Sequence, residues 1–193
     1  MTKIDVSNFD TSNVTQTAYM FANCYALTDL NVAGLNTSKS EYMYWMFSGC
    51  KVLTNLDISS VSTLQIKDEA NMEHFFNGDI SLQSVTLGKD FKFVGTKSYL
   101  PTPASGKWYD TTTGIGYTPA ELAAVVRTGP VTYSAIAPAP VSKTWVINET
   151  PDVSTDMLAT INFTSNGENF DQFQIDSVVP GIIYLKNGSG AGY

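Results

Sequence analysis

Few residues of this chain belong to types that catalyse reactions, and their spacing does not assemble a catalytic site. His74 is the only histidine, and neither Cys24 nor Cys50 has a histidine near it. A nucleophilic side chain needs a neighbouring base, so no such pair is predicted. Asp5 and Asp57 could form a carboxylate pair of the glycosidase kind, but solvated acids on an open surface are the simpler interpretation. We therefore expect no enzymatic activity and no cofactor.

The two cysteines occupy the same place in a repeating pattern. Cys24 and Cys50 are 26 residues apart, and Asp79 takes the corresponding place in the next unit. If successive units stack, the two thiols lie roughly 5 Å apart, the spacing of neighbouring strands. A disulfide is conceivable, although stacked positions seldom orient two cysteines for it; buried free thiols are the alternative. Because Asp79 replaces a third cysteine, the column does not predict a metal site.

The repeat that aligns these residues runs through the first half of the chain. Each unit begins with an aliphatic-x-aliphatic triplet, and the landmarks step by 26 and then by 29 residues. This period is typical of leucine-rich repeats, whose units bury their apolar faces only by stacking. The sequence therefore predicts an α/β repeat, a leucine-rich-repeat solenoid of three to four rungs, each with a strand and a helical turn. The triplets are Ile4-Asp5-Val6, Leu30-Asn31-Val32, Leu56-Asp57-Ile58 and Val85-Thr86-Leu87.

Apolar residues of the turns and helical turns are expected to fill the core of the stack. Phe9 and its counterpart Leu35 should point inward from the turns. So should Met20-Phe21 and the corresponding pairs, Met46-Phe47 and Phe75-Phe76. The Asp, Thr and Ser residues of the same turns should satisfy turn backbone groups.

One column of the alignment combines large rings with an outward position. It holds Tyr19, Trp45 and His74, and Tyr42 and Tyr44 lie beside it. These positions precede the inward pairs and should lean outward. Exposed aromatic side chains on a rigid scaffold are typical of binding hot spots. We expect these five residues to bind the ligand; partial burial of the rings against neighbouring rungs is the alternative interpretation.

A second candidate surface is a polar ladder on the open face of the expected sheet, formed by Asp5, Asn31 and Asp57. Many repeat proteins bind partners on such a face. The net charge of −7 and the lack of any run of Lys or Arg argue against nucleic acid as a partner. No stretch approaches the ~20 apolar residues of a membrane helix, so membrane insertion is not expected.

A family resemblance rests on the first unit. Residues 4–15 (Ile-Asp-Val-Ser-Asn-Phe-Asp-Thr-Ser-Asn-Val-Thr), 19–24 (Tyr-Met-Phe-Ala-Asn-Cys) and 27–30 (Leu-Thr-Asp-Leu) resemble the BspA-like leucine-rich repeat. That repeat occurs on surface proteins of Gram-positive bacteria and mycoplasmas and in some of their phages. The resemblance covers residues 4–95 and is most specific over 4–60. It implies extracellular exposure and adhesion or host contact, and it carries over no binding residues.

The rest of the chain divides by composition. After the repeats (1–95), residues 96–127 contain a hairpin element at Trp108-Tyr109 and a helix start, with Thr118 as N-cap, Pro119 first in the helix and Glu121 as capping-box acid. This stretch resembles the segment that closes the array in related surface proteins and is predicted to be the C-terminal cap. Residues 128–142 hold three of the eight prolines and are predicted to be a linker.

Short β-like runs fill residues 143–193, with Asn-Gly turn signals at 166–167 and 187–188. They predict a small all-β, sandwich-like module. Its start resembles a β-module of phage and prophage structural proteins, and such a module is expected to extend beyond Tyr193, leaving it incomplete in this chain.

The predicted function is that of a non-enzymatic surface or virion protein that recognises or adheres to a host-cell surface glycan or protein. The alternative is a purely structural phage head, tail or fibre protein, with the β-rich module contacting other virion or surface proteins. The expected location is extracellular, on a cell surface or virion. Residues 1–3 lead directly into a strand and form no secretory signal.

Overall fold

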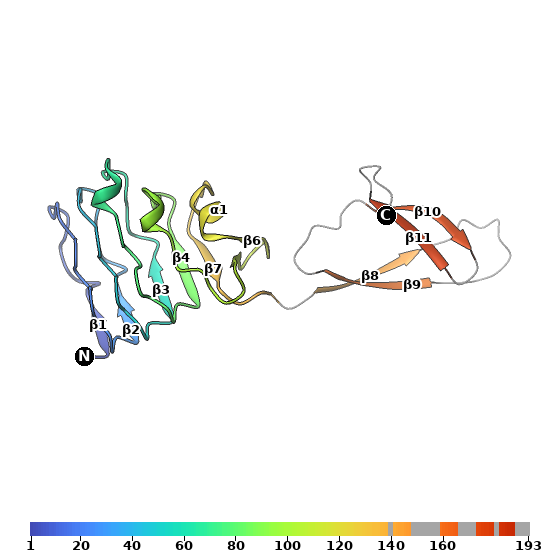
Figure 1. The fold of residues 1–193 in the computed structure, drawn as a ribbon, viewed down its shortest axis with the longest axis horizontal. Coiled ribbons are helices and arrows are strands. Elements are labelled where there is room, and N and C mark those ends of the chain that lie inside the picture. Colours follow the sequence, from blue (N-terminus) through green and yellow to red (C-terminus); the bar gives the residue numbers. More distant parts are fainter. Residues whose placement is uncertain (139–140, 148–158, 166–172, 180–181, 188–193) are drawn as a thin grey trace. The chain divides into compact units, whose positions relative to one another are not determined.

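The structure, a computed structural model, describes residues 1–138, 141–147, 159–165, 173–179 and 182–187. The chain divides into two units, Met1–Pro138 and Ala139–Tyr193, which are described separately. In the first unit, turns and loops connect short strands (Figure 1). They are β1 (Lys3–Asp5), β2 (Asp29–Asn31), β3 (Asn55–Ile58), β4 (Ser84–Leu87), β5 (Trp108–Asp110), β6 (Gly116–Tyr117) and β7 (Val131–Ser134).

Successive repeats lie side by side, as Figure 1 shows for β1 to β4, and parallel strand pairing joins the first repeat to the second and the third to the fourth. Strand β1 pairs with β2 so that Ile4 lies beside Leu30. Strand β3 pairs with β4 so that Leu56 lies beside Val85. The pairing thus joins the positions that the repeat alignment places in one column. Side chains alternate across each strand, which buries the aliphatic residues and leaves the polar ones outside.

The predicted α/β leucine-rich-repeat solenoid, with a helical turn in each of three to four rungs, is wrong. In the described residues the only α-helix is α1 (Pro119–Ala123), which follows the repeats, and the two 3-10 helices, η1 (Glu69–Asn71) and η2 (Thr96–Ser98), have three residues each. The segments that contain Met20-Phe21 and Met46-Phe47, where the helical turns were expected, form turns and bends. Tyr19 and Asn23 explain this in the first repeat, since both have a φ of 61° and a right-handed helix needs negative φ throughout.

The core consists of the aliphatic strand residues and a row of phenylalanine rings. Phe47 and Phe75 are fully buried, with ring centroids 5.2 Å apart. Leu35 is buried as predicted, but Phe9 is 61% exposed and Met20 40% exposed, so the prediction that both point inward is wrong. Both belong to the first repeat, which has a neighbouring repeat on one side only in the described residues. Their counterparts in the second repeat are covered from both sides.

A column of buried threonines joins consecutive repeats. Each hydroxyl donates a hydrogen bond to a backbone carbonyl of the next repeat and accepts one from a backbone N–H of the same residue. A slip in register would leave these buried groups without partners, at a cost of about 1–3 kcal/mol each. The pairs are Thr11 with Asn36 (3.0 and 2.7 Å), Thr37 with Ser62 (2.9 and 2.8 Å) and Thr63 with Lys92 (2.8 and 2.7 Å).

The segment after the repeats continues their sheet. Strand β7 pairs antiparallel with both β4 and β5, giving the order β3-β4-β7-β5-β6. Residues 131–134 therefore belong to a sheet, although the sequence assigned them to the linker at 128–142. The predicted helix start is confirmed: Thr118 caps α1, Pro119 is its first residue, and the Glu121 carboxylate accepts from the Thr118 N–H at 2.8 Å.

A buried arginine ties this closing segment to the last repeat. Arg127 is 8% exposed, and its guanidinium donates hydrogen bonds to the backbone carbonyls of Gly88, at 3.2 Å, and Phe91. A buried guanidinium is stable only when hydrogen bonds replace its water, so Arg127 fixes the closing segment on the repeats.

The second unit contains two antiparallel pairs: β8 (Val141–Ile147) with β9 (Ala159–Ser165), and β10 (Phe173–Val179) with β11 (Ile182–Asn187). The described strands thus form two separate two-stranded sheets, not the sandwich expected from the sequence. The predicted turn at 166–167 lies outside the described residues. None of the helices that the structure describes has the length and apolar character of a membrane span.

Candidate functional site

The predicted binding column has an unusual backbone. Tyr19, Trp45 and His74 have φ values of 61°, 59° and 57°. Residues other than glycine seldom adopt this left-handed conformation, which costs roughly 1–2 kcal/mol per residue. A second left-handed column lies four residues further along each repeat and holds Asn23, Gly49 and Gly78. The second column uses the residue types that tolerate the conformation best, whereas the first uses three large rings.

Hydrogen bonds between repeats fix the backbone of this column. The backbone N–H of Tyr19 donates to the carbonyl of Tyr44 at 3.1 Å, and that of Trp45 donates to the carbonyl of Glu73 at 3.1 Å. The N–H of His74 continues the series to the carbonyl of Lys97 at 2.9 Å. Because these bonds involve only main-chain atoms, they hold the left-handed conformation whatever side chain is present.

The structure brings the predicted rings together. The rings of Tyr19 and Trp45 are stacked, with centroids 6.4 Å apart and planes at 19°. Trp45 and His74 lie closer, at 4.5 Å with planes at 38°. The Tyr44 ring meets Tyr19 edge-on, at 5.3 Å and 86°. The rings therefore form one continuous row, and within the described residues Tyr19 has a ring neighbour of this column on one side only.

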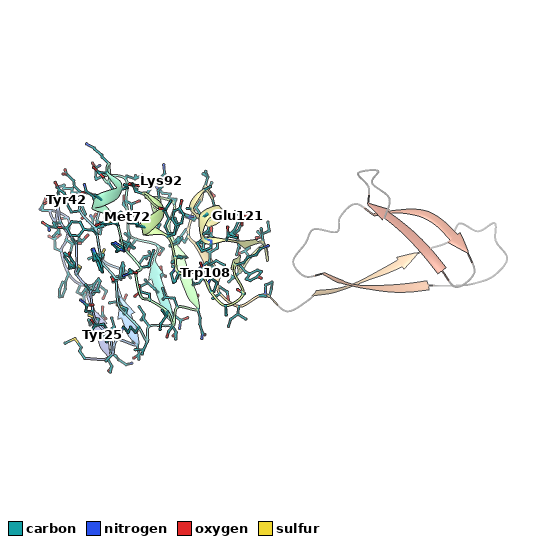
Figure 2. The ribbon with its side chains drawn as sticks, viewed as in Figure 1. Tyr25, Tyr42, Met72, Lys92, Trp108 and Glu121 are labelled. Atoms are coloured by element: carbon teal, nitrogen blue, oxygen red, sulfur yellow. The ribbon has the colours of Figure 1, made fainter. Side chains whose placement is uncertain are left out.

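Exposure is concentrated where the first repeat meets the second. Tyr19 is 56% exposed and Tyr42 is 41% exposed, whereas Tyr44, Trp45 and His74 are half-buried. Partial burial, the alternative interpretation from the sequence, therefore describes the inner rings, while Tyr19 and Tyr42 remain accessible to a ligand. In Figure 2, Tyr42 is labelled at the upper left of the first unit and Tyr25 at the lower left, so the two residues lie at opposite ends of the first repeats.

Gln16 is a polar member of the site that the sequence analysis missed. Its backbone forms an isolated parallel β-bridge with that of Tyr42. Its side-chain amide nitrogen donates a hydrogen bond to the Tyr44 hydroxyl at 3.4 Å. The signal was available, because Gln16 and Tyr42 fall in one column of the repeat alignment. We call the set Gln16, Tyr19, Tyr42, Tyr44, Trp45 and His74 the aromatic ridge.

Charged groups beside the aromatic ridge neutralise each other. The ammonium group of Lys97 lies 3.0 Å from the carboxylate of Glu73, whose backbone carbonyl accepts from Trp45. Both side chains are partly exposed, so water weakens this pair and its effect on stability is small. The pair nevertheless leaves the inner end of the ridge without an uncompensated charge.

The competing polar ladder has a role in local structure. The side-chain oxygens of Asp5, Asn31 and Asp57 each accept a hydrogen bond from the backbone N–H two residues later, at 2.9, 3.1 and 2.9 Å. These bonds stabilise the turn that follows each strand. Hydrogen bonds from the side chain and backbone of Ser7 also hold the pKa of Asp5 below its usual range. The three side chains are exposed, so the ladder remains open to solvent.

The cysteine column contains two free thiols, Cys24 half-buried and Cys50 buried. The Cys50 thiol donates to the Phe21 carbonyl at 3.4 Å, and burial raises its pKa to about 12. Asp79, only 1% exposed, accepts a hydrogen bond from the Cys50 N–H at 2.8 Å. Burial raises the pKa of Asp79 to about 7. Within the described ranges, no group of three or more His, Cys, Asp or Glu side chains is placed to hold a metal ion.

Comparison with known proteins identifies a related family for the repeats. Residues 2–89, a little under half of the chain, match the family described as "Mycoplasma protein of unknown function, DUF285". The match supports the resemblance to BspA-like surface proteins only coarsely, as a mycoplasma family of surface type. No curated protein and no solved structure matches the chain significantly.

Proposed function

We propose that this chain is a non-enzymatic recognition protein of a cell surface or virion, whose aromatic ridge binds a glycan or protein on a host cell. The observation that carries the proposal is Tyr19, a large ring held in a left-handed backbone conformation while 56% exposed. The match of residues 2–89 to a mycoplasma family adds support for the surface setting.

Energetic comparison favours a role for the rings beyond packing. Three left-handed residues cost roughly 3–6 kcal/mol together, whereas the two ring contacts of the column, one stacked and one tilted, contribute about 0.5–1.5 kcal/mol each beyond the area they bury. Burial offsets part of the remainder for Trp45 and His74, which are half-buried. Tyr19 gains least from burial, because more than half of its surface is exposed. Selection for binding would explain a tyrosine where asparagine or glycine fits the backbone better.

The variant Tyr19→Asn tests the proposal, because asparagine tolerates the left-handed conformation and already occupies it at position 23. We expect Tyr19→Asn to keep or raise the melting temperature and to lower binding at least tenfold, as a hot-spot residue does. Binding would be measured on glycan arrays and by pull-down from host membranes. Tyr25→Asn is the control, since Tyr25 is 53% exposed and lies away from the ridge. Equal binding by wild type and Tyr19→Asn would contradict the proposal.

A structural role is the second candidate, and the stacking of the half-buried Trp45 on His74 favours it. In this case the repeats serve as a spacer in a phage head, tail or fibre. Trp45→Ala would then lower the melting temperature sharply, neither assay would detect a ligand, and a protein carrying residues 143–193 would be incorporated into particles. A loss of affinity in Trp45→Ala with little loss of stability favours recognition instead.

A further inference from the structure

We infer that the ligand of the aromatic ridge is an uncharged saccharide, with one sugar ring against the outer face of Tyr19 and hydroxyl groups on Gln16 and Tyr44. The inference rests on the proposed function and goes further, because it names the ligand class and its position. Four features of the described residues support it: the exposed ring of Tyr19, the polar groups at its edge, the size of the pair of exposed rings, and the lack beside the ridge of a cation suited to anionic ligands.

Tyr19 has the most exposed ring of the ridge, at 56%. Trp45 stacks on one side of this ring at 19°, and Tyr44 approaches it edge-on at 86°. No other aromatic partner contacts Tyr19 within residues 1–138. The face of an aromatic ring is electron-rich. The C–H groups on one face of a pyranose carry partial positive charge, so the two surfaces are complementary.

Polar groups next to this face suit sugar hydroxyls. The Gln16 amide nitrogen donates to the Tyr44 hydroxyl at 3.4 Å, and the Tyr44 ring lies 5.3 Å from that of Tyr19. The amide oxygen of Gln16 is an acceptor, and the Tyr44 hydroxyl can both donate and accept. A sugar ring on Tyr19 would therefore find donors and acceptors at its edge, where its own hydroxyl groups lie.

The size of the accessible surface favours a saccharide over a protein. Stable protein interfaces bury about 800 Å² on each partner. On the ridge, only Tyr19 and Tyr42 among the aromatic residues are more than two-fifths exposed, and both lie where the first two repeats meet. One or two sugar rings match the area of these two exposed tyrosine rings.

The distribution of charge argues against sialylated, sulfated or phosphorylated ligands. The chain has a net charge of −7 and a single arginine, Arg127. That guanidinium is buried and bonded to the Gly88 and Phe91 carbonyls, so it is not available for the paired hydrogen bonds by which arginine holds carboxylate or sulfate. Lys97, the lysine that lies beside the ridge, is already paired with Glu73. An anionic glycan would meet repulsion without a compensating partner.

The test compares neutral oligosaccharides based on galactose, glucose and N-acetylglucosamine with their sialylated and sulfated forms, immobilised at equal density. The full chain should bind a neutral form at least tenfold more tightly than its anionic counterparts, and the difference should grow at low salt. Tyr19→Phe, which keeps the ring face, should retain binding. Tyr19→Asn should lose at least tenfold and Gln16→Ala severalfold, with Tyr25→Asn unchanged.

The outcomes separate this inference from the function on which it rests. Tighter binding of an anionic glycan through Tyr19 overturns the neutral-saccharide inference and leaves the recognition function standing. Capture of a host membrane protein through Tyr19, with no glycan bound, also overturns the neutral-saccharide inference and leaves the recognition function standing. Neutral-glycan binding that survives Tyr19→Asn also overturns the inferred position. If neither glycans nor host proteins bind through the ridge, both the inference and the proposed function are wrong.

Discussion

Asp79 should make the stability of the repeats depend on pH in the direction opposite to that of most carboxylates. It occupies the cysteine position of the third repeat, is 1% exposed, and accepts a hydrogen bond from the Cys50 N–H at 2.8 Å. The titratable groups of its column are Cys50 and Cys24, and neither brings a positive charge. Burial outweighs the hydrogen bonds and raises the pKa of Asp79 from 3.8 to about 7.

The magnitude follows from the difference between the folded and unfolded pKa values of Asp79. A rise of about 3 units corresponds to about 4 kcal/mol, at about 1.4 kcal/mol per unit. Below pH 4 both states are protonated and this contribution to stability is fully present. As pH rises toward 7, only the folded state still binds the proton, so the contribution is lost at up to about 1.4 kcal/mol per pH unit. About one pH unit above 7 the loss is complete.

The variant Asp79→Asn isolates this effect, because an amide oxygen can still accept from the Cys50 N–H but cannot ionise. Urea unfolding of both proteins at pH 5, 6, 7 and 8 gives the free energy of unfolding at each pH. We expect the wild type to lose stability from pH 5 to pH 7 relative to Asp79→Asn, and the difference to level off toward pH 8. Glu41→Gln, which removes an exposed carboxyl group, should keep the wild-type slope.

Carboxyl groups with lowered pKa values do not mask the comparison. Hydrogen bonds hold the pKa values of Asp5, Asp10 and Glu121 below their usual range. The stability that they contribute is present above about pH 4 and is lost only as pH falls further. Parallel profiles for wild type and Asp79→Asn between pH 5 and pH 7 would refute the reasoning, because they would mean that Asp79 is ionised in the folded state.

Three further predictions concern the stacking of the repeats. Thr37→Val should lower the free energy of unfolding by about 1–3 kcal/mol, because the buried N–H and carbonyl of the next repeat lose their partner; Thr37→Ser should lose much less in the same denaturation assay. Gly34→Ala should prevent or severely weaken folding by thermal melting, since its Cβ would stand 1.8 Å from a backbone oxygen of the preceding repeat. Gly129→Ala, with nothing within 4 Å, is its control. An alkylating reagent should modify Cys24 in the native protein and Cys50 only after unfolding, by mass spectrometry.

The sequence predicted correctly those features of the fold that depend on neighbouring residues or on the repeat period. The helix start at Thr118 and Pro119 was predictable because the capping residues lie within four positions of one another. The pairing of Ile4 with Leu30 was predictable because one register relates all the repeats. The exposure of Phe9 was not, since the repeat alignment treats Phe9 and Leu35 as equivalent, although only Leu35 has repeats on both sides of it in the described residues.

The helical turns were predicted wrongly because apolar spacing alone does not distinguish a helical turn from a tight turn. Both bring residues three or four apart to the same side, as Met43, Met46 and Cys50 are in the buried core. A contrary signal was present in the column of Asn23, Gly49 and Gly78, since asparagine and glycine at one position of every repeat are typical of a left-handed backbone. That conformation ends a helix within the segment where one was expected.

The same backbone explains why a substitution at Tyr19 can test the proposed binding separately from folding. The main-chain bonds from Tyr19, Trp45 and His74 to the next repeat hold the left-handed conformation without help from the side chains. Core positions such as Phe47 lack this freedom, because their rings fill enclosed space between repeats. At Tyr19, the exposed member of the left-handed column, a change of residue therefore alters the surface while the main-chain bonds to the next repeat remain. This separation lets Tyr19→Asn test binding without testing folding.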